Sequence, residues 1–466
     1  MLNSGCLKII DTARLTPNTA AAQNYCLAAD PTDSVDDAGA LNTCLAAAAN
    51  QTILLSPTGT YLVGSSLTLG QNGTFLGSTG SGRVTLKATN SLSGRILNAN
   101  ASGYTIHRMK FVGRKAYGHD IGDLPAADCH TYGQNVALQG SSFLVDDTET
   151  MDATCGSGMT ATGSEFEIRN SYFHDNGIDS DDSWADGLTV FTCDDCSVHD
   201  NTMEDNTDIG LVVGGGSGGT FEDNTITNTD MHAFAGLHVG WFNGGDGDHA
   251  GITYESNTIT SSEDMMAFGI VVGFEPWYDG LGANGFVSDA GSVVYNTVNG
   301  AVVNLAIEGV GGGYIMNNSL SNNQGTWGFN CSTSVDYTAH FYGNATIQSG
   351  WSAYWFAWGS CGTWNTGLPQ PDSVGALRRN MELIEDEPFY SDGGAYYLNH
   401  QGDGNLVLYN SSHVSQWATG TSTGDRAIMG RDGNLGMSRR LLKFSGGSVD
   451  GPYYATFSSA MTRPSC

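Results

Sequence analysis

The chain has 466 residues, of which 64 are Gly, and its 48 Asp and Glu against 18 Lys and Arg give a formal net charge of −30 at pH 7. This charge repels nucleic-acid backbones and anionic membrane surfaces, so it argues against both as partners. No apolar run is long enough for membrane insertion. A hydrophobic content of 40% supports a packed core, and the abundance of turn residues favours an all-β protein.

The ten cysteines are an even number, which fits disulfides formed in an oxidising compartment. Zinc at Cys193-x-x-Cys196 is the alternative to a disulfide there. The opening residues MLNSGC lack the basic and apolar regions of a signal peptide, so either the peptide is removed or another export route is used. We expect a secreted, extracellular protein with these candidate pairs: Cys26–Cys44, Cys129–Cys155, Cys193–Cys196 and Cys331–Cys361, with Cys6 and Cys466 either paired or free.

Residues 28–98 are predicted to form an N-terminal cap. A helix is expected within residues 33–49, because acidic residues precede it and Leu41, Cys44 and Leu45 fall on one face. The segments ILLSPTGTYLV and SSLTL that follow carry strands over 52–56, 59–63 and 66–69. This order of acidic turn, helix and strands resembles the N-terminal cap of pectate-lyase-like β-helix proteins.

Two strand patterns alternate through residues 99–365. The first is G-[LI]-x-[VI], as in residues 187–190, 210–213, 236–239 and 269–272, and the second is N-T-[MIV], as in residues 201–203, 224–226, 257–259 and 296–298. Asn201 and Asn224 are one β-helix coil apart, and longer intervals imply loops inserted at one corner. We therefore predict a right-handed parallel β-helix over 1–365, with the repeated Asn stacked in a ladder inside a turn. An antiparallel sandwich would need regular hairpin signals, which are not systematic here.

The composition and the repeat pattern of the sequence change after residue 365. Residues 366–377 have the composition of a linker, and residues 378–466 contain the pattern Q-x-D-x-N-x-V-x-Y. This pattern resembles the bulb-type, monocot mannose-binding lectins, and it implies a β-prism that binds a mannose-type glycan through Gln401, Asp403, Asn405, Val407 and Tyr409. A β-prism without sugar binding is the alternative. A second copy keeps Asp432 and Asn434 but has lost the other positions.

Two carboxylates head neighbouring coils. Asp186 precedes a Gly, and Asp208 follows 22 residues later, so we expect them to lie close together on one edge of the helix. One is then the general acid and the other the general base of glycoside hydrolysis, with Asp182 as a third acid. The pair resembles the active sites of polygalacturonases and β-helical α-1,3-glucanases, although the second coil has one Asp instead of two. The alternative is that both Asp residues are ordinary corner or ladder residues of a β-helix, which bind calcium or cap backbone amides.

Further residues are expected around this pair. His238 lies on the predicted outer face and is assigned to proton transfer, while aromatic and acidic side chains from nearby loops are assigned to substrate binding: Trp241, Trp277, Glu275 and Glu308. The outer row of Thr189, Val212, His238, Val271 and Ala306 is expected to border a shallow floor open to a polymer. We expect no required cofactor. The turn Asp246-Gly-Asp248-His249 is expected to be a solvated loop, with calcium binding by its acidic residues as the alternative.

These features predict an extracellular glycoside hydrolase, inverting and acting on a neutral polysaccharide, with the lectin module holding it on a glycan. Two alternatives stay open. A polysaccharide lyase would cleave uronates by β-elimination, but the basic cluster, Lys110 with Arg114 and Lys115, lies several coils before Asp186. A non-catalytic β-helical adhesin or scaffold would present a column without a cleft.

Overall fold

The structure, a computed structural model, describes most of the chain up to residue 342 and parts of its C-terminal region. The described residues are 23–115, 133–178, 184–240, 247–262, 265–273, 288–301, 303–307, 310–321, 324–328, 340–342, 382–383, 388–391, 395–422, 426–429 and 435–438. No helix among them is long and apolar enough to cross a membrane.

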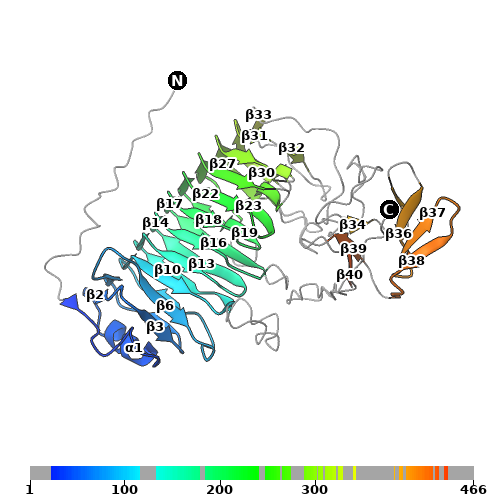
Figure 1. Ribbon diagram of the computed structural model, residues 1–466. Coiled ribbons are helices and arrows are strands. Elements are labelled where there is room, and N and C mark those ends of the chain that lie inside the picture. The colour runs from blue at the N-terminus through cyan, green and yellow to red at the C-terminus, as the bar shows by residue number, and fades with distance from the viewer. Residues whose placement is uncertain are drawn as a thin grey trace, which may run out of the picture.

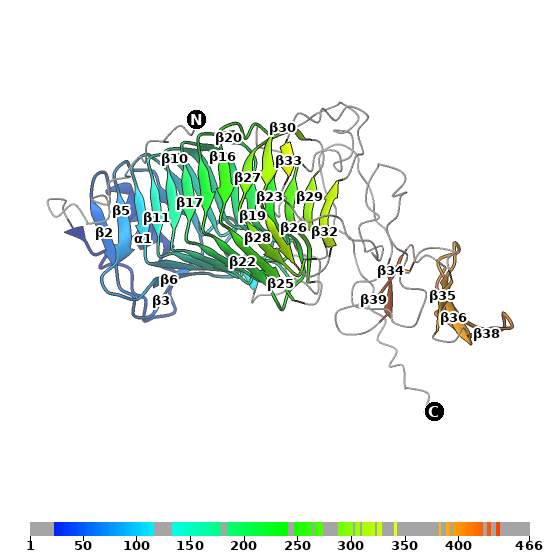
Figure 2. The same ribbon diagram turned by 90° about the horizontal axis from the view of Figure 1, so that it is seen from above.

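Three parallel sheets wind around a common core in the described part of residues 23–342 (Figures 1 and 2). In each sheet, every strand pairs with its counterpart from the preceding and following coils, which makes the domain a parallel β-helix. Sheet A is ordered β1 (Gln23–Asn24), β2 (Thr52–Leu55), β5 (Phe75–Ser78), β8 (Thr105–His107), β11 (Leu144–Asp146), β14 (Glu167–Arg169), β17 (Ser197–His199), β21 (Thr220–Glu222), β24 (Thr253–Glu255), β27 (Ser288–Val294), β30 (Val310–Met316) and β33 (His340–Tyr342).

Sheets B and C complete each coil. Sheet B is ordered β3 (Thr60–Val63), β6 (Val84–Ala88), β9 (Met109–Val112), β12 (Glu149–Met151), β15 (Tyr172–His174), β18 (Thr202–Glu204), β22 (Thr225–Asn228), β25 (Thr258–Ser261), β28 (Thr297–Asn299) and β31 (Ser319–Ser321). Sheet C is ordered β4 (Leu67–Leu69), β7 (Leu97–Asn100), β10 (Val136–Ser141), β13 (Gly156–Ser164), β16 (Ala185–Asp194), β19 (Ile209–Val213), β23 (Ala233–Val239), β26 (Met266–Val272), β29 (Val303–Ile307) and β32 (Gln324–Gly328), with β20 (Gly216–Ser217) beside β16.

The core is built from rows of like residues stacked coil upon coil. Alternation of side chains along each strand turns one set inward, and the register of sheet C aligns Leu188, Leu211, Leu237, Ile270 and Leu305 in one fully buried row. Aromatic side chains stack in the same way, as Tyr104, Phe143 and Phe166 do with ring centroids 4.9 and 4.7 Å apart. Both predicted strand patterns therefore fall in register.

A ladder of buried asparagines lies in the turn between sheets A and B, as predicted. The Nδ2 of Asn224 donates to Oδ1 of Asn257 and to the Val198 carbonyl of the preceding coil, both at 2.9 Å. Its own Oδ1 accepts from the backbone N–H and Nδ2 of Asn201. The same pattern continues through Asn296 and Asn318. Each amide thus satisfies its donors and its acceptor in the absence of water.

The residue before each ladder position takes a left-handed backbone conformation, which allows the two-residue turn. These residues are Asp200, Asp223, Ser256, Tyr295 and Asn317, with φ between 53° and 58°. Earlier in the helix the ladder position is Ser171, whose N–H donates to Asn201 Oδ1 at 3.0 Å, and Asn170 is the left-handed residue. Ser171, rather than the neighbouring Asn170, therefore holds the ladder position in this coil.

The inserted loops occupy two corners. The intervals of 33 and 39 residues between ladder positions 224, 257 and 296 are lengthened mainly after β23 and β26, between sheets C and A. The 30-residue interval from Ser171 to Asn201 is lengthened instead before β16, between sheets B and C. The prediction of one corner holds for the later coils and is wrong for the coil that carries Asp186.

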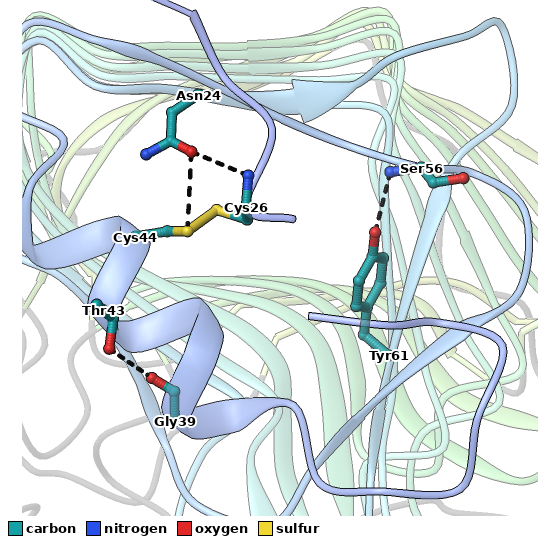
Figure 3. Close-up of a disulfide and its surroundings, with 7 residues drawn as sticks. All are labelled: Asn24, Cys26, Gly39, Thr43, Cys44, Ser56 and Tyr61. Carbon is teal, nitrogen blue, oxygen red and sulfur yellow. Dashed lines mark hydrogen bonds between the residues drawn. A yellow bond between two sulfur atoms is a disulfide. The ribbon is translucent and has the colours of Figure 1, made fainter. Parts of the chain in front are cut away.

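The N-terminal cap helix is α1 (Ala38–Ala46), which buries Ala38, Leu41 and Leu45 against the first coil. Asp37 precedes it, and its carboxylate accepts hydrogen bonds from the backbone N–H groups of Asp30 and Leu62 rather than capping the helix. A disulfide joins Cys44 of α1 to Cys26, as predicted (Figure 3). The helix thereby closes the end of the core that no earlier coil covers.

Of the other predicted disulfides, one is described in full and one at one of its two cysteines. Cys193 and Cys196 form a disulfide, so these two sulfurs do not serve as zinc ligands. Cys155 is disulfide-bonded, but its predicted partner Cys129 lies outside the described residues. The pair Cys331–Cys361, together with Cys6 and Cys466, also lies outside them.

The C-terminal described residues form two small antiparallel sheets. Leu383, Leu406 and Ala427 from the two sheets share one buried cluster. The bulb-type β-prism and the linker 366–377, which falls outside the described residues, stay predictions. One sheet contains β34 (Glu382–Leu383), β39 (Arg426–Met429) and β40 (Leu435–Ser438); the other contains β35 (Phe389–Tyr390), β36 (Tyr396–His400), β37 (Leu406–Asn410) and β38 (Ser415–Ala418).

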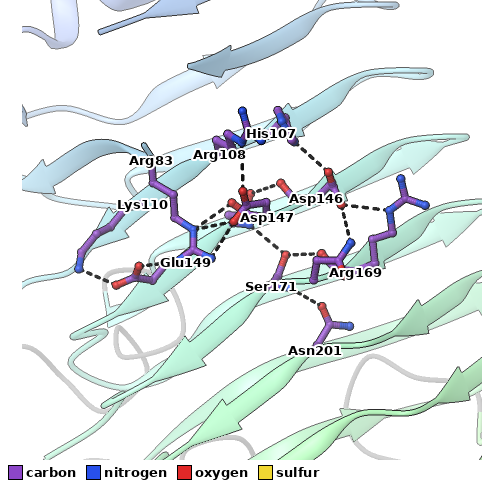
Figure 4. A network of polar contacts seen from close by, with 12 residues as sticks. Arg83, His107, Arg108, Lys110, Asp146, Asp147, Glu149, Arg169, Ser171 and Asn201 are labelled. Carbon is purple, nitrogen blue, oxygen red and sulfur yellow. Dashed lines mark hydrogen bonds and ion pairs between the residues drawn. The ribbon is translucent and has the colours of Figure 1, made fainter. Parts of the chain in front are cut away.

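Charged side chains link neighbouring coils on the outside of sheets A and B (Figure 4). Arg83 bonds Asp147 and Glu149, each at 2.8 Å, and Lys110 bonds Glu149 at 2.5 Å. His174 bridges Glu149 at 3.2 Å and Asp175 at 2.7 Å. Lys110 of the predicted basic cluster is therefore engaged on sheet B, away from sheet C.

His199 of β17, in sheet A, bridges two carboxylates in the same way as His174 does in sheet B. His199 contacts Glu167 at 3.2 Å and Asp200 at 2.7 Å. The hydrogen bond with Glu167 raises the pKa of His199. Burial lowers the pKa of His174, but its bonds with Glu149 and Asp175 outweigh burial and leave the pKa raised. Each imidazolium therefore joins carboxylates within this outer network.

We expect Asn224→Ala to lower the free energy of unfolding by about 3 kcal/mol, because it leaves several buried hydrogen-bonding groups of the ladder unpaired. Chemical denaturation followed by circular dichroism measures this. Thr225→Ala, an exposed position on the adjoining strand, is the matched control and should change stability little. Equal effects of the two substitutions would contradict the ladder's role.

The double substitution His174→Gln, His199→Gln should destabilise the protein most at low pH. A histidine whose folded pKa is raised stabilises the fold fully below its unfolded pKa of about 6.5, and this contribution fades as pH rises through the folded pKa. Thermal unfolding of wild type and variant between pH 5.5 and 9 tests this. A difference in midpoint that does not shrink as pH rises would refute the charged bridges.

Candidate active site

The two predicted acids lie at the heads of adjacent strands of sheet C. Asp186 is the second residue of β16, and Asp208 immediately precedes β19. The N–H of Asp208 donates to the Ala185 carbonyl at 3.1 Å, which places Asp208 one residue out of register with Asp186. The coils are about 4.8 Å apart. The structure therefore brings the two predicted acids together at one edge of the helix.

The Asp186 carboxylate is held by three donors. Its Oδ2 accepts from Thr189 Oγ1 at 2.6 Å and from Ser157 Oγ at 3.4 Å. Its Oδ1 accepts from the Ile209 N–H at 3.3 Å. The two hydroxyls also contact each other at 2.8 Å. Asp186 is therefore oriented from its own strand, from the coil before and from the coil after.

Burial raises the pKa of both carboxyls. It raises that of Asp186 to about 7, against the opposing hydrogen bonds from Thr189, Ile209 and Ser157. Burial and then the negative charge of Asp186 raise the pKa of Asp208 well above its usual range. Both side chains keep some solvent access, although protein atoms surround them densely. A carboxylate pair that shares one proton near neutral pH can supply an acid and a base together.

The outer row beside the pair is in the predicted register but is not exposed. Thr189, Val212, His238, Val271 and Ala306 align across five coils. Each side chain is only 2–3% exposed. These outward positions are therefore covered, because outward orientation on a sheet does not ensure access to solvent. The shallow floor expected beside the row stays a prediction.

His238 is an interior histidine. Burial lowers its pKa to about 3, and the proximity of His249 acts in the same direction. His249 is itself fully buried, with Nδ1 bonded to the Tyr254 hydroxyl at 2.6 Å and its pKa lowered by burial to about 4. His249 is thus not part of a solvated loop. Both imidazoles are neutral at physiological pH, and a proton-transfer role for His238 stays a prediction.

Four predicted residues lie outside the described residues, together with the third acid. These are Trp241, Trp277, Glu275, Glu308 and Asp182. In the turn assigned calcium-ligand character, Asp246 is also outside them, whereas the Asp248 carboxylate accepts from the Ala250 N–H at 2.9 Å. In the described part of the chain, no group of three or more His, Cys, Asp or Glu side chains is arranged to hold a metal ion.

The structure adds polar residues that the sequence patterns did not reveal. Arg95, Gln134, Ser157 and Asp186 come from the starts of strands on four successive coils, β7, β10, β13 and β16. Arg95 Nε donates to Gln134 Oε1 at 2.8 Å, and Gln134 and Ser157 are buried. In the later coils Ile209, Ala235 and Phe268 continue this line. Only strand register could have found these residues, because no local motif marks them.

The residues of the lectin-like pattern gather at the β36–β37 hairpin. Gln401 Nε2 donates to the Tyr409 hydroxyl at 3.1 Å, and Val407 is buried. The Asp403 carboxylate accepts from the Asn405 N–H at 2.9 Å. The Asn405 side-chain Oδ1 accepts from the Thr419 hydroxyl and the Gly420 N–H, each at 2.9 Å. Gln401 and Tyr409 therefore lie together, whereas Asp403 and Asn405 hold the turn.

Comparison with known proteins agrees with the fold. Residues 95–280 match the sequence family described as a right handed beta helix region. No match is found among curated proteins. The chain therefore contains a right-handed parallel β-helix.

Solved structures similar to this chain are distant. They include an exopolygalacturonase from Thermotoga maritima (11% identity, 70% of this chain and 95% of that chain, TM-score 0.49). An alginate lyase from Paenibacillus shows 14% identity over 66% of this chain and 95% of that chain, with a TM-score of 0.42. The Dettilon tailspike protein shows 13% identity over 69% and 68%, also with a TM-score of 0.42. At these values the similarities transfer no activity.

Proposed function

We propose that this protein is a secreted glycoside hydrolase that cleaves a polysaccharide with inversion of configuration, using Asp186 and Asp208 as its acid and base. The observation that carries the proposal is the placement of the two carboxylates on adjacent coils, at the heads of β16 and β19. Burial raises the pKa of both, and the charge of Asp186 adds to the rise at Asp208. The sequence resemblance of these two coils to polygalacturonases and α-1,3-glucanases supports a glycan as substrate.

The chemistry needs one protonated and one ionised carboxyl. The acid donates its proton to the glycosidic oxygen as the bond from that oxygen to the anomeric carbon breaks. The base removes a proton from a water molecule, whose oxygen forms the new bond to the anomeric carbon from the opposite face. The acid loses one proton and the base gains one, so the pair returns to its starting state when the base releases its proton to solvent and the acid takes one up from solvent.

Asp186→Asn and Asp208→Asn should each lower turnover about 1,000-fold, because each removes one proton-transfer group. A reducing-end assay across neutral and acidic polysaccharides measures this, with absorbance near 235 nm recorded in parallel. Asp194→Asn is the matched control, since Asp194 is exposed at the far end of the same strand.

The assay separates the alternatives. New reducing ends without absorbance, lost in both variants but not in Asp194→Asn, support hydrolysis. Rising absorbance would establish elimination and replace the hydrolase with a lyase. Full activity in Asp186→Asn would overturn the assigned pair, and the absence of product from every glycan would favour a scaffold or adhesin.

We further propose that the C-terminal sheets bind a mannose-type glycan and hold the enzyme on its substrate. The support is the Gln401–Tyr409 hydrogen bond beside Tyr397, whose ring stacks on Tyr409 with centroids 5.1 Å apart. Hydroxyl and amide groups flanked by an aromatic face suit a sugar ring.

Tyr409→Phe should weaken binding to mannose-type glycans about tenfold, because it removes one hydroxyl while keeping the ring. Binding is measured by calorimetry with the full chain. Tyr396→Phe is the control, because Tyr396 is the neighbouring strand residue of Tyr397 and its side chain takes the opposite face. Unchanged binding in Tyr409→Phe would remove the assigned sugar site, whatever the hydrolytic activity.

A further inference from the structure

The hydroxyl groups around Asp186 form a directed chain. Thr189 has one hydroxyl proton, and its 2.6 Å contact with Asp186 Oδ2 is the shortest bond of the cluster, so that proton points at the carboxylate. Ser157, 2.8 Å from the Thr189 hydroxyl and 3.4 Å from Asp186, then donates to the Thr189 oxygen. Ser157 and Thr189 are both 3% exposed, so water does not compete strongly with these bonds.

The Asp208 carboxylate lacks such donors in the part of the chain that the structure describes. Among the residues that the structure describes, none donates a hydrogen bond to the Asp208 carboxylate. Hydrogen bonds from hydroxyl and N–H donors stabilise the charged form of a carboxyl group. Among the described residues the environment is therefore asymmetric: Asp186 accepts from the Thr189 hydroxyl and the Ile209 N–H, with Ser157 supporting Thr189, and Asp208 accepts from no side chain or N–H.

We propose that Thr189, supported by Ser157, is a positioning residue that keeps Asp186 ionised and aimed as the base, and so leaves the shared proton on Asp208 as the acid. This inference rests on the proposed function, because it assigns the two roles within that pair. It identifies Thr189 and Ser157 as groups that act through Asp186 and do not touch the substrate.

The raised pKa values agree with this order. Burial raises the pKa of Asp186 to about 7, and burial together with the charge of Asp186 raises the pKa of Asp208 well above its usual range. With falling pH, Asp186 gains its proton and the base is lost. The acidic limb of the pH profile for kcat/KM therefore reports Asp186, and the basic limb reports Asp208.

The row that contains Thr189 supplies the test variants. Thr189 aligns with Thr160 of the preceding coil and Val212 of the following coil. Valine is thus accommodated at this register position, so Thr189→Val removes the hydroxyl at nearly constant volume. Thr160 makes its hydroxyl contact with the Val136 carbonyl and not with Asp186, which makes Thr160→Val the matched control.

The experiment measures kcat/KM against pH for wild type, Thr189→Val, Thr189→Ser, Ser157→Ala and Thr160→Val. In Thr189→Val we expect the acidic limb to move from about pH 7 upward by about one pH unit, the effect of losing one hydrogen bond to a charged group. Ser157→Ala should give a smaller shift in the same direction. Thr189→Ser should restore the wild-type limb, and Thr160→Val should leave it in place.

NMR titration of ¹³C-labelled Asp carboxyls measures the protonation midpoint of Asp186 directly, with no substrate present. The Asp186 signal is identified by its loss in Asp186→Asn. An unmoved Asp186 midpoint in folded Thr189→Val would overturn the inference even if both Asp→Asn variants are inactive. A raised midpoint in a protein whose Asp186→Asn variant stays active would instead overturn the proposed function and leave the hydroxyl effect standing. A shift of equal size in Thr160→Val would also refute the inference.

Discussion

The asparagine ladder is the constraint on which the rest of the structure depends. A parallel β-helix must return each coil to the same register, and backbone pairing alone does not distinguish a correct register from one shifted by a residue. From residue 201 to residue 318 the buried ladder Asn makes that distinction, because its amide finds all its partners only when the next amide lies directly above. The left-handed residue before it, such as Asp223, lets the chain turn there without burying unpaired groups.

Once the register is set, residues far apart in sequence become neighbours along rows. The row that is apolar in later coils at Ile209, Ala235 and Phe268 carries Ser157 and Asp186 in earlier ones. The candidate site therefore lies where a polar row meets an apolar one. Desolvation there raises the pKa of the Asp186 carboxyl to about 7. The hydroxyls that face this carboxyl act in the opposite direction and limit the rise.

Burial and pairing act oppositely on the histidines of this protein. His238 and His249 are buried, and burial lowers the pKa of both so far that they are neutral at physiological pH. On the outside of sheets A and B, His174 and His199 each lie between two carboxylates and retain their charge more readily. The charged outer network links coils, whereas the neutral interior histidines fill space. A single residue type thus serves two purposes according to its neighbours.

The sequence by itself determined the features that depend on local periodicity. The strand rows, the ladder Asn, the cap helix with its disulfide and the proximity of Asp186 to Asp208 all follow from spacing of about one coil, which repeats wherever side chains alternate. Only the tertiary structure decided that the outer row is buried, that His249 is internal and that Ser157 contacts Asp186. Those outcomes depend on contacts between coils 23 to 39 residues apart, and solvent access at a strand position depends on everything packed over it, which no local pattern encodes.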